Sequence, residues 1–330
     1  MKKSLTYLLF LPQLLLLLQS CRHSQPEFAF ELRDGYRVAK VHIPVSKNDS
    51  AAAYWLLPDS IPAAGCPAVL LFHDHGAWFT IGKEKLVRPM QADSLLFEQS
   101  DYWVNKFYAG AYVGDSLAAH GFAVLVTDAL YWGSRSPAML SGSLPFASIK
   151  ALNKQLKNDQ PEFYAQHLAK QSEPWFETIL SDDRASLDWL LSRPEVDARR
   201  VGVAGFSLGA YRAWMLAAED SRPAWCFAAN WMTTMEAHGG TLPDVSAYSM
   251  YRPMLDSVDY PEIAARAAVR PMMLLYGSDD PVAPPAAVEE AVARIRTLVP
   301  DAPLQAVEQD GPHRFTPLSL QLLLQFAKEK

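Results

Sequence analysis

The stretch from Val201 to Ala210 constrains this chain more than any other. It reads Val-Gly-Val-Ala-Gly-Phe-Ser-Leu-Gly-Ala, an apolar run that leads into a Gly-x-Ser-x-Gly pentad, and a segment rich in Ala, Trp, Met and Leu follows. This pattern predicts a strand, a sharp turn and a helix, with Ser207 at the turn. In so tight a turn, a side chain at Gly205 or Gly209 would collide with a neighbouring backbone.

Ser207 is therefore the candidate nucleophile. The turn raises its hydroxyl above the end of a sheet, at the first turn of a helix whose unpaired N–H groups favour negative charge. The pentad also arises by chance in unrelated chains, so its meaning depends on partners elsewhere in the sequence.

Short apolar runs separated by helical patterns recur along the rest of the chain. Because strand and helix alternate, we expect an α/β fold with a doubly wound, mostly parallel β-sheet flanked by helices. Three earlier segments, at 28–32, 36–43 and 51–57, are expected to form an antiparallel edge. The remaining expected strands are 67–73, 122–127, 201–206, 225–230, 271–276 and 303–308, and the expected helices are 110–120, 179–192, 208–219, 260–268, 286–299 and 317–330.

Three connections, at about 75–106, 131–175 and 231–259, are too long to be plain turns. Each leaves the carboxyl end of a predicted strand, the edge at which ligands bind in open α/β sheets. We expect them to build a substrate pocket or lid. Their aromatic residues suit sugar rings or apolar acyl groups, although such rings also pack loops. The candidate substrate-binding residues are Trp78, Trp132 and Trp231.

Acyl transfer also needs a base, a group that orients the base, and N–H donors for the oxyanion. Downstream of Ser207, two predicted strands run into Gly-Ser-Asp279-Asp280-Pro and into Asp-Gly-Pro-His313. His313 is the candidate general base, and Asp280 is the candidate carboxylate that orients it. Asp279 is the alternative acid, in which case Asp280 would cap the following helix.

The order Ser207, Asp280, His313 is the α/β-hydrolase order. From about Ala51 onward the chain resembles the dienelactone-hydrolase-like and acetylxylan-esterase-like members of that superfamily. Residues 277–284 are similar to the acid loop Gly-x-x-Asp-x-x-x-Pro, and Gly-Pro-His313 is similar to the histidine loop. The resemblance implies an α/β-hydrolase fold, a Ser-His-Asp triad, ester hydrolysis through an acyl-enzyme, and no cofactor. Dienelactone hydrolases proper use a cysteine nucleophile, and the serine here departs from that pattern.

The oxyanion hole of this fold takes one N–H from the residue after the nucleophile, here Leu208. The second comes from the loop that follows the strand at 67–73. The family usually has glycine where this chain has Asp74, so His75 N–H is our choice and Ala77 N–H the alternative. Two histidines one residue apart in this loop could suggest a metal, but spacing fixes no third ligand, and we expect none.

Other charged residues near these loops have simpler interpretations. Lys83, Lys85 and Arg88 are expected to form a solvated face, and binding of an acidic substrate is the functional alternative. Asp128, at the end of a strand, is expected to make a structural hydrogen bond across loops, with Arg135 as a candidate partner.

The first twenty-one residues have a different composition. Two lysines precede an apolar run at 5–18 that Pro12 interrupts, and Leu-Gln-Ser-Cys21 closes it. This resembles a bacterial lipoprotein signal peptide with lipid added at Cys21; the alternative is an uncleaved membrane anchor. We therefore expect residues 1–21 to be a signal and 22–330 a single domain, exported to the periplasm or cell surface and held at the membrane only by lipid.

Composition limits the remaining possibilities. Half of the 330 residues are hydrophobic, which allows a large core, and a formal net charge of −6 argues against nucleic acid as a partner. Besides Cys21 only Cys66 and Cys226 remain, and we expect two separate buried thiols. The expected function is cleavage of a small-molecule or polysaccharide ester, in particular of the acetylxylan type. A serine peptidase on the same scaffold and a non-catalytic glycan-binding lipoprotein are the alternatives.

Overall fold

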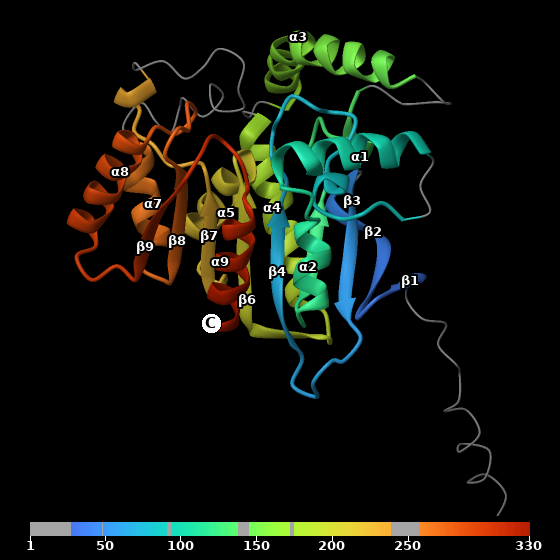
Figure 1. Ribbon diagram of the computed structural model, residues 1–330, viewed down its shortest axis with the longest axis horizontal. Helices are drawn as coiled ribbons and strands as arrows, with labels where there is room; N and C mark the ends of the chain where they lie inside the picture. The colour runs from blue at the N-terminus through green and yellow to red at the C-terminus, as the bar shows by residue number, and fades with distance from the viewer. Residues whose placement is uncertain (1–27, 48, 91–93, 138–144, 172–174, 239–257) are drawn as a thin grey trace, which may run out of the picture.

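The computed structural model describes residues 28–47, 49–90, 94–137, 145–171, 175–238 and 258–330. Its strands are β1 (Phe30–Arg33), β2 (Tyr36–Ser46), β3 (Asp49–Pro58), β4 (Cys66–Phe72), β5 (Ala123–Thr127), β6 (Val196–Phe206), β7 (Trp225–Ala229), β8 (Met272–Gly277) and β9 (Leu304–Gln309). Across the described residues they form one nine-stranded sheet in the order β1-β2-β3-β5-β4-β6-β7-β8-β9 (Figure 1).

The sheet is mixed in the way that the sequence predicts. Strands β1, β2 and β3 pair antiparallel, and β3 joins β5 antiparallel, whereas every pair from β5 through β9 is parallel. Residues of β5, β7 and β8 are all buried, which is why these strands read as continuous apolar runs. The predicted strands are all present, with ends shifted by a few residues.

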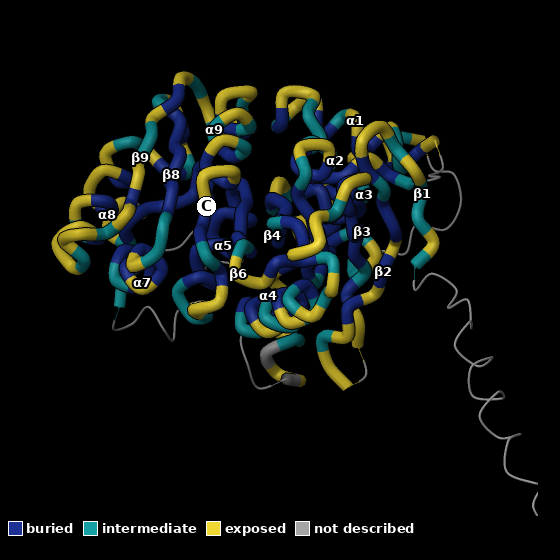
Figure 2. The backbone as a smooth tube through the Cα atoms, turned by 90° about the horizontal axis from the view of Figure 1, so that it is seen from below, coloured by how far each residue is buried: buried dark blue, intermediate teal, exposed yellow. Residues whose placement is uncertain are grey.

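Helices cover both faces of the sheet, so the doubly wound fold is confirmed. One face packs against α4 (Trp175–Leu191), α5 (Leu208–Glu219), α7 (Tyr260–Ala267) and α8 (Pro285–Leu298). The other packs against α1 (Ser94–Phe107), α2 (Val113–Ala119) and α9 (Pro317–Lys328). Figure 2 shows the consequence, with buried strands lying between helices whose outer turns are exposed.

Two helices lie inside connections that the sequence analysis left as loops. These are α1 and α3 (Phe146–Gln171), and α3 lies across the upper end of the sheet in Figure 1. The long α3 carries Pro161 in its interior, and polar Asn153 and Gln160 interrupt its buried face, so its apolar periodicity is weak. It is held to the strand-end loops instead, since Tyr131 Oη donates to Leu156 O at 2.8 Å.

Three short 3₁₀ turns complete the described structure: η1 (Lys83–Lys85), η2 (Gly133–Arg135) and η3 (Glu236–His238). Within the described ranges, no helix combines the length and apolar character that a membrane crossing requires. The predicted signal at residues 1–21, with Cys21, and most of the predicted connection at 231–259 lie outside the described residues.

Candidate active site

The turn between β6 and α5 has the strained geometry expected at Ser207. Its φ and ψ are 57° and −123°, a conformation that non-glycine residues rarely adopt. A Cβ on Gly205 would lie 2.2 Å from the Gly209 carbonyl carbon, and one on Gly209 would lie 2.1 Å from Phe72 O. The predicted steric need for both glycines is therefore confirmed, and the tight packing lifts the Ser207 hydroxyl above the sheet.

The structure brings Ser207, His313 and Asp280 into one chain of hydrogen bonds. His313 Nε2 lies 2.8 Å from Ser207 Oγ, and His313 Nδ1 lies 2.8 Å from Asp280 Oδ2. Strand register explains the meeting, because Gly277 pairs with Gln309 and the acid and histidine loops leave these neighbouring ends. With Nδ1–H donated to Asp280, Nε2 is left to accept the serine proton.

Asp280, and not Asp279, faces the imidazole. Asp280 is buried and its Oδ1 accepts the N–H groups of Val282 at 2.8 Å and Ala283 at 3.2 Å. Burial would raise the pKa of this carboxyl, but hydrogen bonds and the charge of His313 lower it below the ordinary value. Asp279 is exposed. The geometry thus separates the two candidates that the sequence left open.

The loop predicted to complete the oxyanion hole begins beside the turn that carries Ser207. Phe72, the last residue of β4, pairs with Gly205, and a Cβ on Gly209 would lie 3.1 Å from His73 O. Leu208 is the first residue of α5, where N–H groups have no partner within the helix. Ala77 N–H is donated to His75 Nδ1 at 3.1 Å. Ala77 N–H is engaged in this way, and His75 N–H stays the prediction for the second donor.

Residues 100–307 match the family model described as the dienelactone hydrolase family, which covers more than half of the chain. The chain belongs to the dienelactone hydrolase family. The matched region contains Ser207 and Asp280 and ends before His313.

The chain is similar to a curated protein of Bacillus subtilis (strain 168), YtaP, which is described as a hydrolase and is 26% identical over 196 residues. That match covers 59% of this chain and 53% of YtaP, so the chain spans about half the length of the curated relative it matches.

Solved structures of esterases share the fold. A Bacteroides fragilis protein described as an acetyl xylan esterase superposes with a TM-score of 0.58 at 16% identity, covering 85% of this chain and 68% of that one. A glucuronoyl esterase from Solibacter usitatus gives 0.55 at 14% identity, covering 92% and 86%. A Klebsiella pneumoniae protein described as a dienelactone hydrolase gives 0.55 at 15% identity, covering 89% and 99%. At these identities the likeness concerns the fold alone.

Asn230 and Gln309 extend the site of this family member, and the sequence analysis missed both. Asn230 Nδ2 donates to Asp280 Oδ2 at 2.9 Å, and Gln309 Nε2 donates to Asn230 Oδ1 at 3.2 Å. Asn230 directly follows β7 and Gln309 is the last residue of β9, and both strand ends lie at the edge that carries Ser207. Their polarity at the end of an apolar strand was the available signal, but nothing in the local pattern distinguishes these two from other polar residues at strand ends.

The three candidate substrate-binding tryptophans are buried. Trp78 packs against Tyr102 and Trp103, Trp132 donates its Nε1–H to His75 O at 3.1 Å, and Trp231 packs against Tyr211 and Trp214. In this structure the rings are used for packing the loops, and the predicted contacts with substrate are not supported by the geometry.

The expectation of a solvated face at Lys83 and Lys85 is wrong. Both are buried, because Lys83 Nζ pairs with Asp128 Oδ2 at 2.8 Å and Lys85 Nζ pairs with Asp74 Oδ2 at 3.5 Å. Asp128 is structural as predicted, but its partner is Lys83; Arg135 pairs with Asp49 and Asp182 instead. Both lysines thus hold loops together and offer no charge to a substrate.

The remaining candidates are structural in this geometry. His73 is fully buried, its Nδ1 hydrogen-bonds to Asp74 O at 2.9 Å and its Nε2 accepts Ala129 N–H at 3.1 Å. Both of its ring nitrogens are therefore occupied by the backbone. Cys66 and Cys226 are free and buried, as expected, and burial raises the pKa of both thiols.

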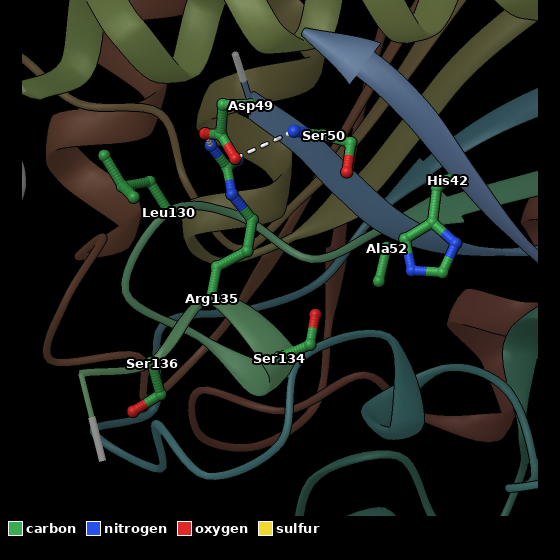
Figure 3. A pocket seen from close by; sticks show the side chains of 8 residues that line it. All are labelled: His42, Asp49, Ser50, Ala52, Leu130, Ser134, Arg135 and Ser136. Atoms are coloured by element: carbon green, nitrogen blue, oxygen red, sulfur yellow. Dashed lines mark hydrogen bonds and ion pairs between the residues drawn. The ribbon is translucent and has the colours of Figure 1, made fainter. Parts of the chain in front are cut away.

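An open cavity of about 450 Å³ lies elsewhere at this edge of the sheet (Figure 3). It lies along β2 and β3, and β5 and β4 separate these strands from β6 and the nucleophile. Arg135 lines the cavity, and its guanidinium is already paired with Asp49 and Asp182. This cavity is therefore distinct from the candidate active site. Its lining consists of His42, Asp49, Ser50, Ala52, Leu130, Ser134, Arg135 and Ser136.

Proposed function

We propose that this member of the dienelactone hydrolase family is a serine hydrolase that cleaves carboxylic esters through an acyl-enzyme. The observation that carries the proposal is the continuous hydrogen-bonded chain from Ser207 Oγ through His313 to Asp280, with both contacts of the imidazole at 2.8 Å. Nucleophile, base and orienting carboxylate are the parts that acyl transfer requires, held in the required order.

Each step of the reaction has a group to perform it. Ser207 Oγ attacks the ester carbonyl while His313 Nε2 takes its proton, and the Leu208 and His75 N–H groups receive the developing oxyanion. The imidazolium, stabilised by Asp280, then protonates the departing alkoxide, and an acyl-serine remains. Water activated by His313 attacks this acyl group and releases the acid.

A fluorophosphonate probe tests the proposal. Folded wild-type protein should be labelled at Ser207, and Ser207→Ala should lose both the label and ester turnover, with a fall in kcat on the order of 10⁶-fold. Ser207 sits at the helix start with a hydroxyl that caps nothing within α5, so the alanine variant should fold. Absence of labelling on folded wild-type protein would favour the non-catalytic, glycan-binding alternative.

We further propose carbohydrate esters, in particular of the acetylxylan type, as the substrates. The support is indirect, since acetyl xylan and glucuronoyl esterases are among the proteins that share the fold. Acetate release from acetylated xylan should exceed alcohol release from a glucuronate ester. The reverse ranking would assign the glucuronate class, and cleavage of a peptide substrate alone would assign the peptidase alternative.

Export as a lipoprotein is a separate proposal that rests on the first twenty-one residues. Mass spectrometry of the protein purified from bacterial membranes should find a chain that begins at lipid-modified Cys21, and Cys21→Ser should release the protein from the membrane fraction. A mature chain that retains residue 1 would support the uncleaved anchor instead.

A further inference from the structure

We propose that the buried pair Asp74 and Lys85 positions the oxyanion hole by fixing the peptide plane that carries the His75 N–H. The inference rests on the proposed function, because it assigns the device that holds one of its oxyanion donors. Neither residue touches the reacting atoms, so both are positioning residues.

Lys85 is fully buried and its ammonium is directed at the backbone of this loop. Its Nζ donates to Asp74 O at 2.9 Å and to His75 O at 3.0 Å, two successive carbonyl groups. A buried ammonium is costly unless it is paired and hydrogen-bonded, so these contacts dictate where the two carbonyls can point.

The direction of the carbonyls decides the direction of the N–H. In a trans peptide the C=O of Asp74 and the N–H of His75 point to opposite sides of the same plane. No described peptide bond is cis. The Asp74 carbonyl oxygen is also hydrogen-bonded by His73 Nδ1 at 2.9 Å, so two groups bind this oxygen. His75 N–H therefore points away from Lys85, and flipping the plane would break both contacts.

The Asp74 carboxylate anchors the ammonium beneath the loop. Its Oδ1 accepts Trp103 Nε1–H at 3.1 Å and Tyr108 Oη–H at 2.6 Å, and its Oδ2 lies 3.5 Å from Lys85 Nζ. Trp103 lies on α1 and Tyr108 follows it. The departure from glycine at position 74 is thus explained, because the side chain present there ties the oxyanion loop to α1 and η1.

Lys83 provides a matched control on the same 3₁₀ turn. It is also a buried lysine paired with carboxylates, Glu84 at 2.8 Å and Asp128 at 2.8 Å, but its ammonium bonds no carbonyl of residues 74 or 75. In Lys83→Met/Glu84→Gln, Asp128 keeps three donors, from Lys83 N, Ser134 N and Ser134 Oγ. Replacing either pair should lower the free energy of unfolding by a similar amount. Only the replacement of Asp74 and Lys85 should affect the oxyanion hole.

The test compares Asp74→Asn/Lys85→Met with Lys83→Met/Glu84→Gln on an activated acetyl ester. The first should lower kcat by about 10²-fold or more with KM within about threefold, as when one oxyanion donor is lost. The second should keep kcat within about threefold at a comparable loss of Tm. Inhibition by a trifluoromethyl ketone, which forms an oxyanion on Ser207, should weaken in parallel with kcat only in the first variant.

Equal losses of kcat in the two variants, or an unchanged inhibition constant in the first, would overturn the proposal. If the double variant does not fold, Asp74→Asn alone keeps an acceptor for Trp103 and Tyr108 while removing the carboxylate that anchors the Lys85 ammonium, and should lower kcat about tenfold. Unchanged turnover in that folded variant also overturns it. Failure of the proposed function is seen separately, as wild-type protein that the fluorophosphonate does not label.

Discussion

Asn230 connects the Ser207 turn to the loop that carries Asp280. Its φ is 56°, its backbone N–H donates to Leu275 O at 2.8 Å, and its side chain donates to Asp280. The carbonyl just before it, that of Ala229, accepts Ser207 N–H at 2.9 Å. The unusual backbone conformation lets one residue serve both loops, and Gln309 fixes the orientation of its amide.

Replacing this amide by a carboxylate should move the pH profile. In Asn230→Asp, a second negative charge beside Asp280 favours the protonated imidazole, so the acidic limb of kcat/KM should shift to higher pH by about one unit. Profiles on an acetyl ester measure the shift. Asn230→Ala, which removes the amide without adding charge, should lower turnover and leave the limb in place; an equal shift in both would contradict the charge argument.

The acid assignment is tested with the two neighbouring aspartates. Asp280→Asn should lower kcat by about 10⁴-fold, because an amide in place of the carboxylate no longer stabilises the imidazolium or holds the required tautomer. Asp279 is exposed, and Asp279→Asn should stay within about threefold of wild type. If only the Asp279 change abolished turnover, Asp279 and not Asp280 would be the acid.

Among the elements, α9 is connected through its N-terminal cap to the hydrogen bonds that join Gln309, Asn230 and Asp280. Thr316 and Ser319 form a reciprocal capping box, and both hydroxyls also donate to Gln309 Oε1, at 2.7 Å and 2.8 Å. The helix start thereby fixes the side chain that orients Asn230. The order of the last strand, histidine loop and last helix is visible in the sequence, but this cross-connection is not.

Removing the cap should destabilise the protein modestly. Thr316→Ala loses the side-chain acceptor of Ser319 N–H and a donor to Gln309, and should reduce the free energy of unfolding by about 1 kcal/mol. Urea denaturation measures the change. Thr316→Ser keeps the hydroxyl and should lie close to wild type, whereas an equal loss in both variants would mean that the methyl group, and not the cap, matters.

At the scale of the whole molecule, two imidazoles with lowered pKa values lie at the sheet edge that carries Ser207, where His73 is buried and His75 is half-buried. Burial, and secondarily the charge of Lys85, lowers the pKa of His75 from 6.5 to about 4 and the pKa of His73 well below 6.5. At a pH between these lowered pKa values and 6.5, the two histidines are protonated in the unfolded chain but not in the folded protein. The stabilisation from keeping them neutral is therefore complete above about pH 6.5 and is lost as the pH falls toward 4.

Acid should accordingly destabilise the fold through these groups. The free energy of unfolding from urea titrations should fall between pH 7 and pH 5, and His75→Gln should show a smaller fall than wild type. Asp182 acts in the opposite sense, since burial raises its pKa to about 6, so the difference between variant and wild type is the informative quantity. Parallel pH dependences would exclude a contribution from His75.

The sequence by itself determined the strands, their parallel arrangement and the chemical types at the strand ends. Short continuous apolar runs are typical of strands buried on both faces, and a strained Gly-x-Ser-x-Gly turn admits few geometries. It missed α1 and α3, because both lie inside long connections and polar residues interrupt their buried faces, Gln99 and Ser100 in α1 and Asn153 and Gln160 in α3. Local sequence pattern therefore predicted the β-sheet and the placement of Ser207 and His313 at strand ends.

Only the tertiary structure decided which side chains meet. Asp280 faces His313 while Asp279 faces solvent, and Lys83 and Lys85 are buried although their sequence reads as exposed. Asn230 reaches Asp280 across two strand ends, a contact with no local signature. Such choices depend on strand register and on partners far along the chain, since burial of a charge is acceptable only where a distant residue neutralises it.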